Sequence, residues 1–256
     1  MRVAITRGVS ARIGECELTH LERQVIDAGR AREQHRAYET ALYRSGCRVE
    51  SLPALDDLPD SVFVEDVAVV LDEIAIVTRP GAESRRPEAA EIAPALAAYR
   101  PLISIQPPGT LDGGDVLRLG RQLFVGESGR SNMAAIGQLR DVVRPHGYTV
   151  TPVPLRGCLH LKSAVTEAAP GVVLANPNWV DPAAFGAEDV IEVDPGEPSA
   201  ANGLLIGSRL IYPSSFPMTQ RRLENAGIEI ALVDVSELQK AEGAVTCCSL
   251  IFENRA

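Results

Sequence analysis

The feature that most constrains the fold is a module that recurs along the chain: an apolar hairpin, then a helix, then a short apolar strand. Its clearest copy pairs residues 62–70 with residues 74–78, and continues with a helix over 87–99 and a strand over 102–105. Short runs rich in Val and Ile predict the strands, and Pro87 predicts where the helix begins. The module predicts an α/β fold built from repeated units.

About five such units of roughly 40–50 residues fill the chain, and repeats of this length usually form closed or stacked architectures. One unit is divided between the two ends: residues 244–252 are expected to pair with residues 3–6, followed by a helix over 32–46 and a strand over 49–52. Joining the ends closes a ring and removes exposed sheet edges. The remaining units are predicted, as hairpin, helix and strand, over 115–125, 131–146 and 148–153; over 163–174, 182–185 and 190–193; and over 203–212, 218–226 and 228–233. No linker interrupts the chain, which predicts one domain over residues 1–256.

Side chains at the helix ends and faces support these boundaries. Ala31, Tyr38 and Leu42 fall on one face of the helix near 32–46, as an amphipathic helix requires. Ser131 is expected to cap the helix over 131–146, and Gly147 to stop it.

Composition excludes several function classes. The net charge is −9 and Lys and Arg do not cluster, which argues against a nucleic-acid partner. The chain shows neither an apolar stretch long enough to span a membrane nor a signal-peptide core, so no membrane partner is expected. The five cysteines have no spacing typical of disulfide frameworks or zinc sites, which predicts a reducing, cytoplasmic location.

The two residues that could together carry out thiol chemistry, a cysteine and a histidine, lie in apolar runs. Cys247 is part of a β-rich run, where a cysteine is more often a small buried hydrophobic residue than a nucleophile. His160 lies between two leucines, a setting more typical of a core histidine. If the run is a strand, Cys247 and Cys248 point to opposite faces, and only one of them can face an active site.

Acidic residues in otherwise apolar segments favour catalysis. Glu65 and Asp66 open a buried run, and unpaired buried carboxylates are costly, so a cationic partner is expected. Asp112-Gly113-Gly114-Asp115 has the composition of a turn, but its glycines also allow close backbone approach to a ligand. Arg85 and Arg130 lie in loops; each is either surface charge or a clamp for a carboxylate.

Five ordered stretches together resemble the dimethylarginine dimethylaminohydrolase family of the pentein, or guanidino-group-modifying, superfamily. They are LPDSVFVEDVA (58–68), TRPGAESRR (78–86), TLDGGDV (110–116), LHLKS (159–163) and TCCS (246–249). The resemblance implies a five-bladed α/β propeller of ββαβ units with pseudo-fivefold symmetry. It also implies a thiol mechanism that needs no metal or organic cofactor.

The resemblance assigns a role to each matching position. Cys247 corresponds to the nucleophile, His160 to the general acid and base, and Asp112 to an orienting acid. It implies that Glu65 and Asp66 contact the guanidinium end of the substrate, and that Asp60 and the Leu18 carbonyl contact its α-amino group. It also implies that Arg85 and Arg130 bind the α-carboxylate and that Ala241 makes a backbone contact.

Lys162 separates this chain from the related arginine deiminases and amidinotransferases, which usually carry an acid two residues after the histidine. One carboxylate fewer leaves fewer acceptors for an unsubstituted guanidinium and more room for N-methyl groups. The sequence thus predicts hydrolysis of Nω-methylated arginines to citrulline and a methylamine. The alternatives are a different guanidino hydrolase, such as an arginine deiminase-like enzyme, and a non-catalytic arginine-binding pentein. The expected partner is a small guanidino substrate, and a homodimer is allowed.

Overall fold

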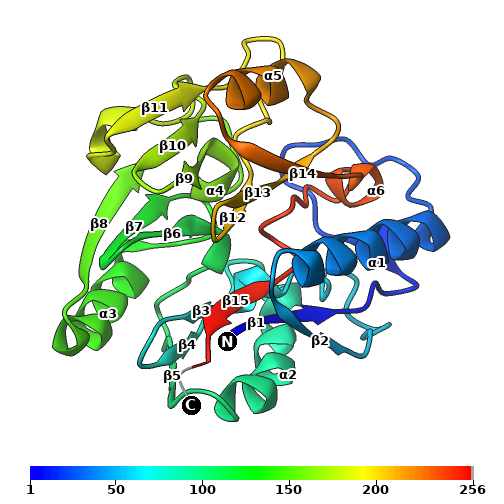
Figure 1. The fold of residues 1–256 in the computed structure, drawn as a ribbon. Helices are drawn as coiled ribbons and strands as arrows, with labels where there is room; N and C mark the ends of the chain where they lie inside the picture. The colour runs from blue at the N-terminus through cyan, green and yellow to red at the C-terminus, as the bar shows by residue number, and fades with distance from the viewer. Residues whose placement is uncertain (255–256) are drawn as a thin grey trace.

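The computed structural model describes residues 1–254, in which five three-stranded sheets follow one another along the chain (Figure 1). The middle strand of every sheet pairs antiparallel with one neighbour and parallel with the other. The sheets are β15 (Leu250–Glu253), β1 (Arg2–Arg7) and β2 (Arg48–Leu52); β3 (Ala68–Val70), β4 (Ala75–Val77) and β5 (Leu102–Ser104); β6 (Val116–Leu119), β7 (Gln122–Glu127) and β8 (Thr149–Pro154); β9 (Val165–Ala169), β10 (Val172–Ala175) and β11 (Asp189–Glu192); and β12 (Leu204–Ile206), β13 (Arg209–Pro213) and β14 (Glu229–Val233).

Each parallel pair is joined by a crossover, because parallel strands cannot be linked by a tight turn. The crossovers contain α1 (Ala28–Arg44), α2 (Arg86–Ala97), α3 (Met133–Val143), the 3₁₀ turn η6 (Pro182–Phe185) and α5 (Pro217–Asn225). The remaining short helices are α4 (Leu161–Ala164), α6 (Ser236–Gln239), η1 (Ile13–Glu15), η2 (Val64–Val67), η3 (Glu83–Arg85), η4 (Gly113–Asp115) and η5 (Arg144–His146). The predicted ring of ββαβ units is therefore confirmed. Among the described residues, every helix is too short or too polar to cross a bilayer.

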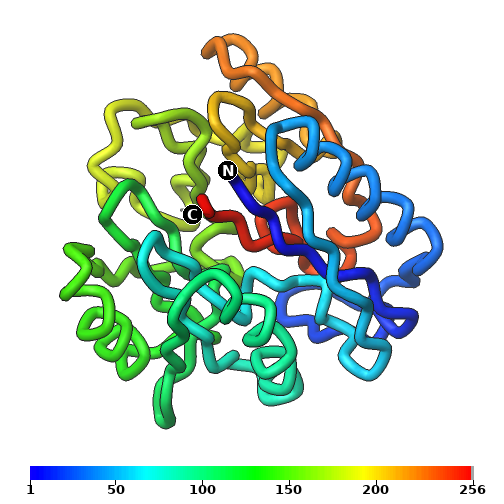
Figure 2. Tube along the Cα trace, turned by 60° about the horizontal axis from the view of Figure 1, so that its bottom comes forward, coloured from blue at the N-terminus to red at the C-terminus, as the bar shows by residue number. Residues whose placement is uncertain are grey.

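The two ends of the chain complete one unit. β1 pairs with β15 in antiparallel register, with Val3 opposite Phe252 and Ile5 opposite Leu250, and with β2 on its other side. Figure 2 shows the units grouped around a centre, with the first and last strands side by side. This pairing closes the ring within the one unit that the two ends share.

Two predicted strands are shorter than expected. Of residues 62–70 only β3 pairs, because Val64–Val67 turn as η2 and the Glu65 N–H donates to the Cys247 carbonyl at 3.1 Å. Of residues 244–252 only Leu250 onward is strand, and both cysteines lie in the preceding turn. We expected strand alternation to point Cys247 and Cys248 to opposite faces. The two side chains do differ in exposure, but the stated reason is wrong, because both residues lie in a turn and not in a strand. Cys248 is fully buried in the core, whereas Cys247 is partly exposed.

Two further predictions concern the side chains of helices α3 and α1. The cap of α3 is Asn132, which accepts from the Ala135 N–H, and not Ser131 as predicted. The Ser131 hydroxyl instead donates to Asp115. The buried face of α1 includes Ala31, Tyr38 and Leu42, as predicted.

Tyr38 ties α1 to the turn that carries the cysteines. Its side chain is fully buried, and its hydroxyl donates to the Val245 carbonyl at 2.7 Å and lies 2.6 Å from the Ser249 hydroxyl oxygen. A buried tyrosine hydroxyl needs such partners. The helix therefore holds the turn from both sides of Cys247.

Close packing between η2 and η4 depends on a glycine. A Cβ atom at Gly113 would lie 2.0 Å from the Glu65 carbonyl oxygen, whereas a Cβ at Gly137, inside α3, would meet no atom within 4 Å. We expect Gly113→Ala to lower the free energy of unfolding by about 1–3 kcal/mol through overpacking. The matched change Gly137→Ala should raise it by about 0.5–1 kcal/mol, because alanine favours a helix. Urea denaturation of both variants measures this, and equal stabilities would contradict the close approach.

Candidate active site

Segments that lie far apart in the sequence meet around a small cavity, called here the cysteine cavity. Glu17 comes from the segment between η1 and α1. η2 and the residues before it also contribute, and so do the residues directly before α2, α3, α4 and β15. The residues that line it are Glu17, Asp60, Phe63, Asp66, Arg85, Arg130, Leu159, His160, Ala241, Glu242, Gly243 and Cys247. Seven of the residues predicted from the sequence are in this set, among them Cys247 and His160.

Cys247 lies in a strongly negative environment. Burial, followed by the charges of Glu65 and Asp66, raises the pKa of its thiol well above the usual value. Low polarity and like charge both disfavour a thiolate. In the unliganded protein Cys247 is therefore a neutral thiol at neutral pH, and a cation next to it would favour the nucleophilic form.

His160 is held between two carboxylates. Its Nε2 lies 3.0 Å from Asp112 Oδ2, and its Nδ1 lies 3.7 Å from Asp66 Oδ1. Burial alone would lower the pKa of this imidazole, but the negative charge of Asp66 and the hydrogen bond to Asp112 outweigh burial and raise the pKa to about 9. His160 thus carries a proton at neutral pH and can donate it.

Glycine and backbone groups hold the carboxylates in place. Asp112 is completely buried, accepts from the Gly81 N–H at 2.9 Å and contacts His160 through its other oxygen. Asp66 accepts from the Gly114 N–H at 3.1 Å. A Cβ at Gly114 would lie 2.5 Å from the His160 ring, so the second glycine of this turn allows the histidine to approach.

Asp115 supports the histidine segment indirectly. Its carboxylate accepts from the Leu161 N–H at 3.0 Å and from the hydroxyls of Ser128 and Ser131 at 2.5 and 2.6 Å. Burial raises the pKa of Asp115 to about 6 despite these donors. Asp115 therefore anchors the residue that follows His160. The sequence signal for this contact was the second aspartate of the 112–115 turn.

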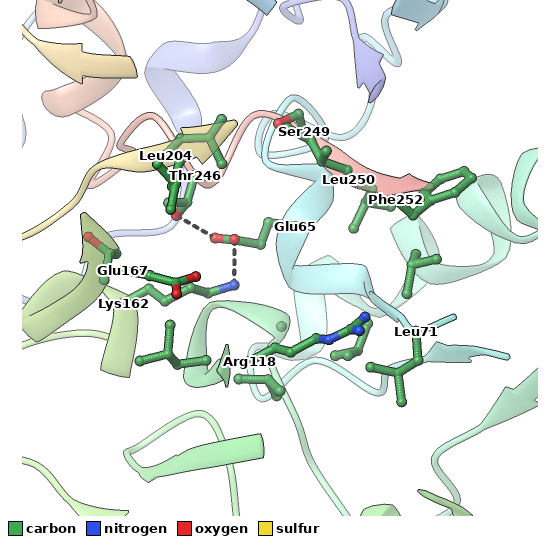
Figure 3. Close-up of a pocket in the computed structure, with 18 of the residues that line it drawn as sticks. Glu65, Leu71, Arg118, Lys162, Glu167, Leu204, Thr246, Ser249, Leu250 and Phe252 are labelled. Atoms are coloured by element: carbon green, nitrogen blue, oxygen red, sulfur yellow. Dashed lines mark hydrogen bonds and ion pairs between the residues drawn. The ribbon is translucent and has the colours of Figure 1, made fainter. Parts of the chain in front are cut away.

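Glu65 does not line the cysteine cavity. It lines a larger cavity of about 460 Å³, called here the central cavity, whose walls come from β3, β6, β9, β12 and β15, the first strand of every unit. Figure 3 shows the Glu65 carboxylate between Lys162, at 2.5 Å, and the Thr246 hydroxyl, at 2.8 Å. Glu65 and Lys162 therefore neutralise each other at the end of the central cavity. This pairing was missed because sequence spacing does not show which acid a lysine meets.

The two predicted arginines differ in how fully they are engaged. Arg85 is buried, and its guanidinium donates to Asp66 at 2.6 Å, to Glu88 at 2.8 Å and to the backbone carbonyls of Asp60 and Phe63. Arg130 donates to the Thr19 hydroxyl at 2.8 Å, and its Nη1 lies 4.0 Å from Asp112. Arg130 therefore has more donors free for an anion than Arg85.

The amino-group contacts predicted from the sequence are only partly brought together. Asp60 lines the cysteine cavity, but Leu18 does not, and packs against the hydrophobic cluster that contains the buried face of α1. Ala241, for which a backbone contact was predicted, also lines the cavity. Asp60 accepts from the Glu17 N–H at 3.0 Å. Burial raises the pKa of Asp60, and Arg85 opposes this shift.

Glu242 is a site residue that sequence reasoning missed. Its carboxylate accepts from three consecutive backbone N–H groups, those of Thr19 at 2.9 Å, His20 at 2.5 Å and Leu21 at 2.7 Å. Its backbone is left-handed, with φ of 58°. It fastens the loop over residues 17–21 beside the cysteine cavity, and nothing in the local sequence marks this long-range contact.

Asp66, Asp112 and His160 also form a set that could hold a metal ion, because one ligand atom of each lies within 4.8 Å of the others. A protonated imidazole has no nitrogen lone pair left to bind a metal, so protonated His160 is a proton donor and not a metal ligand. The geometry therefore suits a cationic organic group next to a proton donor and a thiol.

A ring of five ββαβ units around a cysteine, a histidine and buried carboxylates defines a protein of the pentein, or guanidino-group-modifying, class. The N(G),N(G)-dimethylarginine dimethylaminohydrolase of Streptomyces coelicolor is 44% identical over 249 residues, covering 96% of this chain and 95% of that protein. The chain belongs to the dimethylarginine dimethylaminohydrolase family. No protein-family model matches the chain.

Solved structures agree. The Pseudomonas aeruginosa dimethylarginine dimethylaminohydrolase, as a cysteine-to-serine mutant complexed with citrulline, superposes with a TM-score of 0.91 at 32% identity, covering 97% of this chain and 98% of that one. The N-terminal domain of ArgZ, an arginine dihydrolase, superposes with a TM-score of 0.85 at 18% identity, over 99% of this chain and 98% of that one. The latter likeness shows the shared fold alone.

The pKa of His160 gives a pH prediction. Because the folded pKa of about 9 exceeds the ordinary 6.5, the stability from this charge cluster is fully present below pH 6.5 and is lost as pH rises through about 9. Asp112→Asn removes one charge, so it should lower the free energy of unfolding at pH 6 by about 1–3 kcal/mol and much less at pH 10. Asp141→Asn, at an exposed position of α3, is the control and should change neither value. A loss for Asp112→Asn that is the same at both pH values would contradict the charge pairing.

Proposed function

We propose that the protein hydrolyses Nω-methylated L-arginines, namely asymmetric dimethylarginine and monomethylarginine, to L-citrulline and dimethylamine or methylamine. The observation that carries the proposal is that a partly exposed thiol, Cys247, shares one cavity with a buried, protonated histidine, His160. The family relationship supports it, as does the citrulline bound to the Pseudomonas aeruginosa relative.

In the first proposed step the substrate guanidinium lies against Asp66, with Glu65 behind Cys247. The added positive charge lowers the thiol pKa, the thiol proton passes to solvent, and the resulting Cys247 thiolate attacks the central guanidinium carbon. His160 donates its proton to the departing nitrogen, the C–N bond breaks, and the amine leaves. A covalent thiouronium remains on Cys247. Dividing a difficult substitution at a resonance-stabilised carbon into two steps is the advantage of a covalent intermediate.

In the second proposed step water attacks the same carbon. His160 is now neutral and accepts a proton from the water. The C–S bond breaks, the second proton of the water passes to the departing sulfur and restores the neutral thiol, and the new C–O bond becomes the ureido carbonyl of citrulline. Asp112 keeps the imidazole oriented in both steps, through its 3.0 Å contact with Nε2.

The amino-acid end of the substrate is assigned to the opposite side of the cavity. Arg130 is the main carboxylate partner, since Arg85 is already held by Asp66 and Glu88. Asp60 and the Leu18 carbonyl are assigned to the α-amino group, and Ala241 to a backbone contact with the substrate. Glu65 is also assigned to the guanidinium end, and its pairing with Lys162 leaves Asp66 as the carboxylate of that end that lines the cysteine cavity.

A cytoplasmic location is inferred as well, which the five unpaired cysteines favour. A homodimer and a single catalytic domain over residues 1–256 stay predictions.

The assignment of the nucleophile is tested by a matched pair. Cys247→Ser should abolish amine release from dimethylarginine, because a serine hydroxyl is a poor nucleophile in a negative site. Cys248→Ser should keep most of the activity, because Cys248 is buried in the core with its sulfur 3.6 Å from the Ala244 carbonyl. An assay of released dimethylamine measures both. The reverse pattern would assign the nucleophile to Cys248.

The assignment of the carboxylate clamp is tested with substrates that differ only at that end. Arg130→Ala should lower kcat/KM for monomethylarginine by an amount that corresponds to about 2–4 kcal/mol of lost transition-state stabilisation. It should have little effect on methylagmatine, which lacks the carboxylate and should already be poor. Parallel losses for both substrates would contradict the clamp. Arginine, assayed alongside, should be slower than dimethylarginine, and faster ammonia release from arginine would favour a deiminase.

A further inference from the structure

A second cavity, of about 480 Å³, lies beside the cysteine cavity. We call it the tryptophan cavity. Its apolar walls come from Leu21, Leu159, Trp179, Pro213 and Phe216. Trp179 is the single tryptophan of the chain. Neither step of the proposed reaction uses this cavity.

The wall between the two cavities consists of the segments that lead to the reacting groups. Leu159, Glu242 and Gly243 line both cavities. Leu159 directly precedes His160, and Gly243 lies four residues before Cys247. The tryptophan cavity therefore borders the segments that lead to the sulfur and the imidazole.

One loop covers both cavities. Glu17 lines the cysteine cavity, His20 and Leu21 line the tryptophan cavity, and Glu242 binds the backbone between them. The two cavities thus share wall residues and border the same loop.

We propose that the tryptophan cavity holds the substituent of the departing nitrogen when that substituent is a large apolar alkyl or aryl group. The substrate class then extends from methylated arginines to arginines with a larger Nω group. The inference rests on the proposed function. The chemistry is unchanged: the same C–N bond breaks, the larger amine leaves with the proton from His160, and water supplies the oxygen of citrulline.

The position of His160 determines which guanidinium nitrogen departs and therefore carries the substituent. The imidazole must reach the departing nitrogen to protonate it, so a substituent on that nitrogen starts beside His160 and runs along Leu159. The central cavity is a poorer place for an apolar group, because Arg2, Arg118 and Glu167 line it and the Glu65–Lys162 pair closes its near end (Figure 3). Aromatic and aliphatic walls favour an apolar group through burial of its surface.

Fluorescence of Trp179 tests where the substituent goes. Nω-benzyl-L-arginine and Nω-methyl-L-arginine are each titrated into the Cys247→Ser protein, with excitation selective for tryptophan. The benzyl compound should shift the emission of Trp179, whereas the methyl compound should bind without doing so. If the benzyl compound competes with methylarginine for binding but leaves the emission unchanged, the proposal is overturned.

A filling substitution tests the effect on turnover. Ser199 is exposed and lines the tryptophan cavity, whereas Ser208 is exposed in the turn between β12 and β13 and lines neither cavity. Ser199→Phe should lower kcat/KM for the benzyl compound at least about tenfold, the scale of discrimination by pocket shape, and leave dimethylarginine within about twofold. Ser208→Phe should change neither substrate.

The outcomes separate the two proposals. If the wild-type protein hydrolyses dimethylarginine but not the benzyl compound, or if Ser199→Phe affects both substrates equally, the subsite is wrong and the proposed function stands. If neither compound releases an amine, the proposed function fails first, and the subsite fails with it.

Discussion

The pairing of β1 with β15 is the constraint on which the rest of the structure depends. It joins the two ends of the chain into one sheet, and the turn that carries Cys247 enters that sheet directly. Tyr38 of α1 and the Glu65 N–H hold the same turn from two other directions. The position of the thiol therefore follows from ring closure, because the residues that fix it come from the first, second and last parts of the chain.

Electrostatic balance explains why the centre of the ring suits a cation. Buried carboxylates are tolerated only when positive charge compensates them. Arg85 neutralises Asp66 and Glu88, Lys162 neutralises Glu65, and His160 holds a proton. The pKa of Glu88 is nevertheless raised to about 7, chiefly by burial, although Arg85 opposes the shift. The Cys247 thiol is in the field of Glu65 and Asp66, and a guanidinium group next to it would add positive charge there.

The sequence predicted the ring because hydrophobic periodicity is local, and each ββαβ unit repeats it. It predicted Cys247, His160, Asp66 and Asp112 through motifs that recur in the family, and these four do come together. Chain segments that turn were less predictable. Residues around Glu65 and Cys247 look like strand in composition, but the bond between them bends both segments. Likewise, the contact of Glu242 with the loop over residues 17–21 spans more than 200 residues, and no short pattern encodes such a pairing.

The fastening of that loop by Glu242 has a structural consequence. Three successive backbone donors share one carboxylate, so a single side chain sets the position of the loop beside the cysteine cavity. The left-handed backbone at Glu242 is unfavourable for a residue with a side chain, and these three bonds compensate for it. The shape of one side of the cavity therefore depends on one residue that is more than 200 positions away in the sequence.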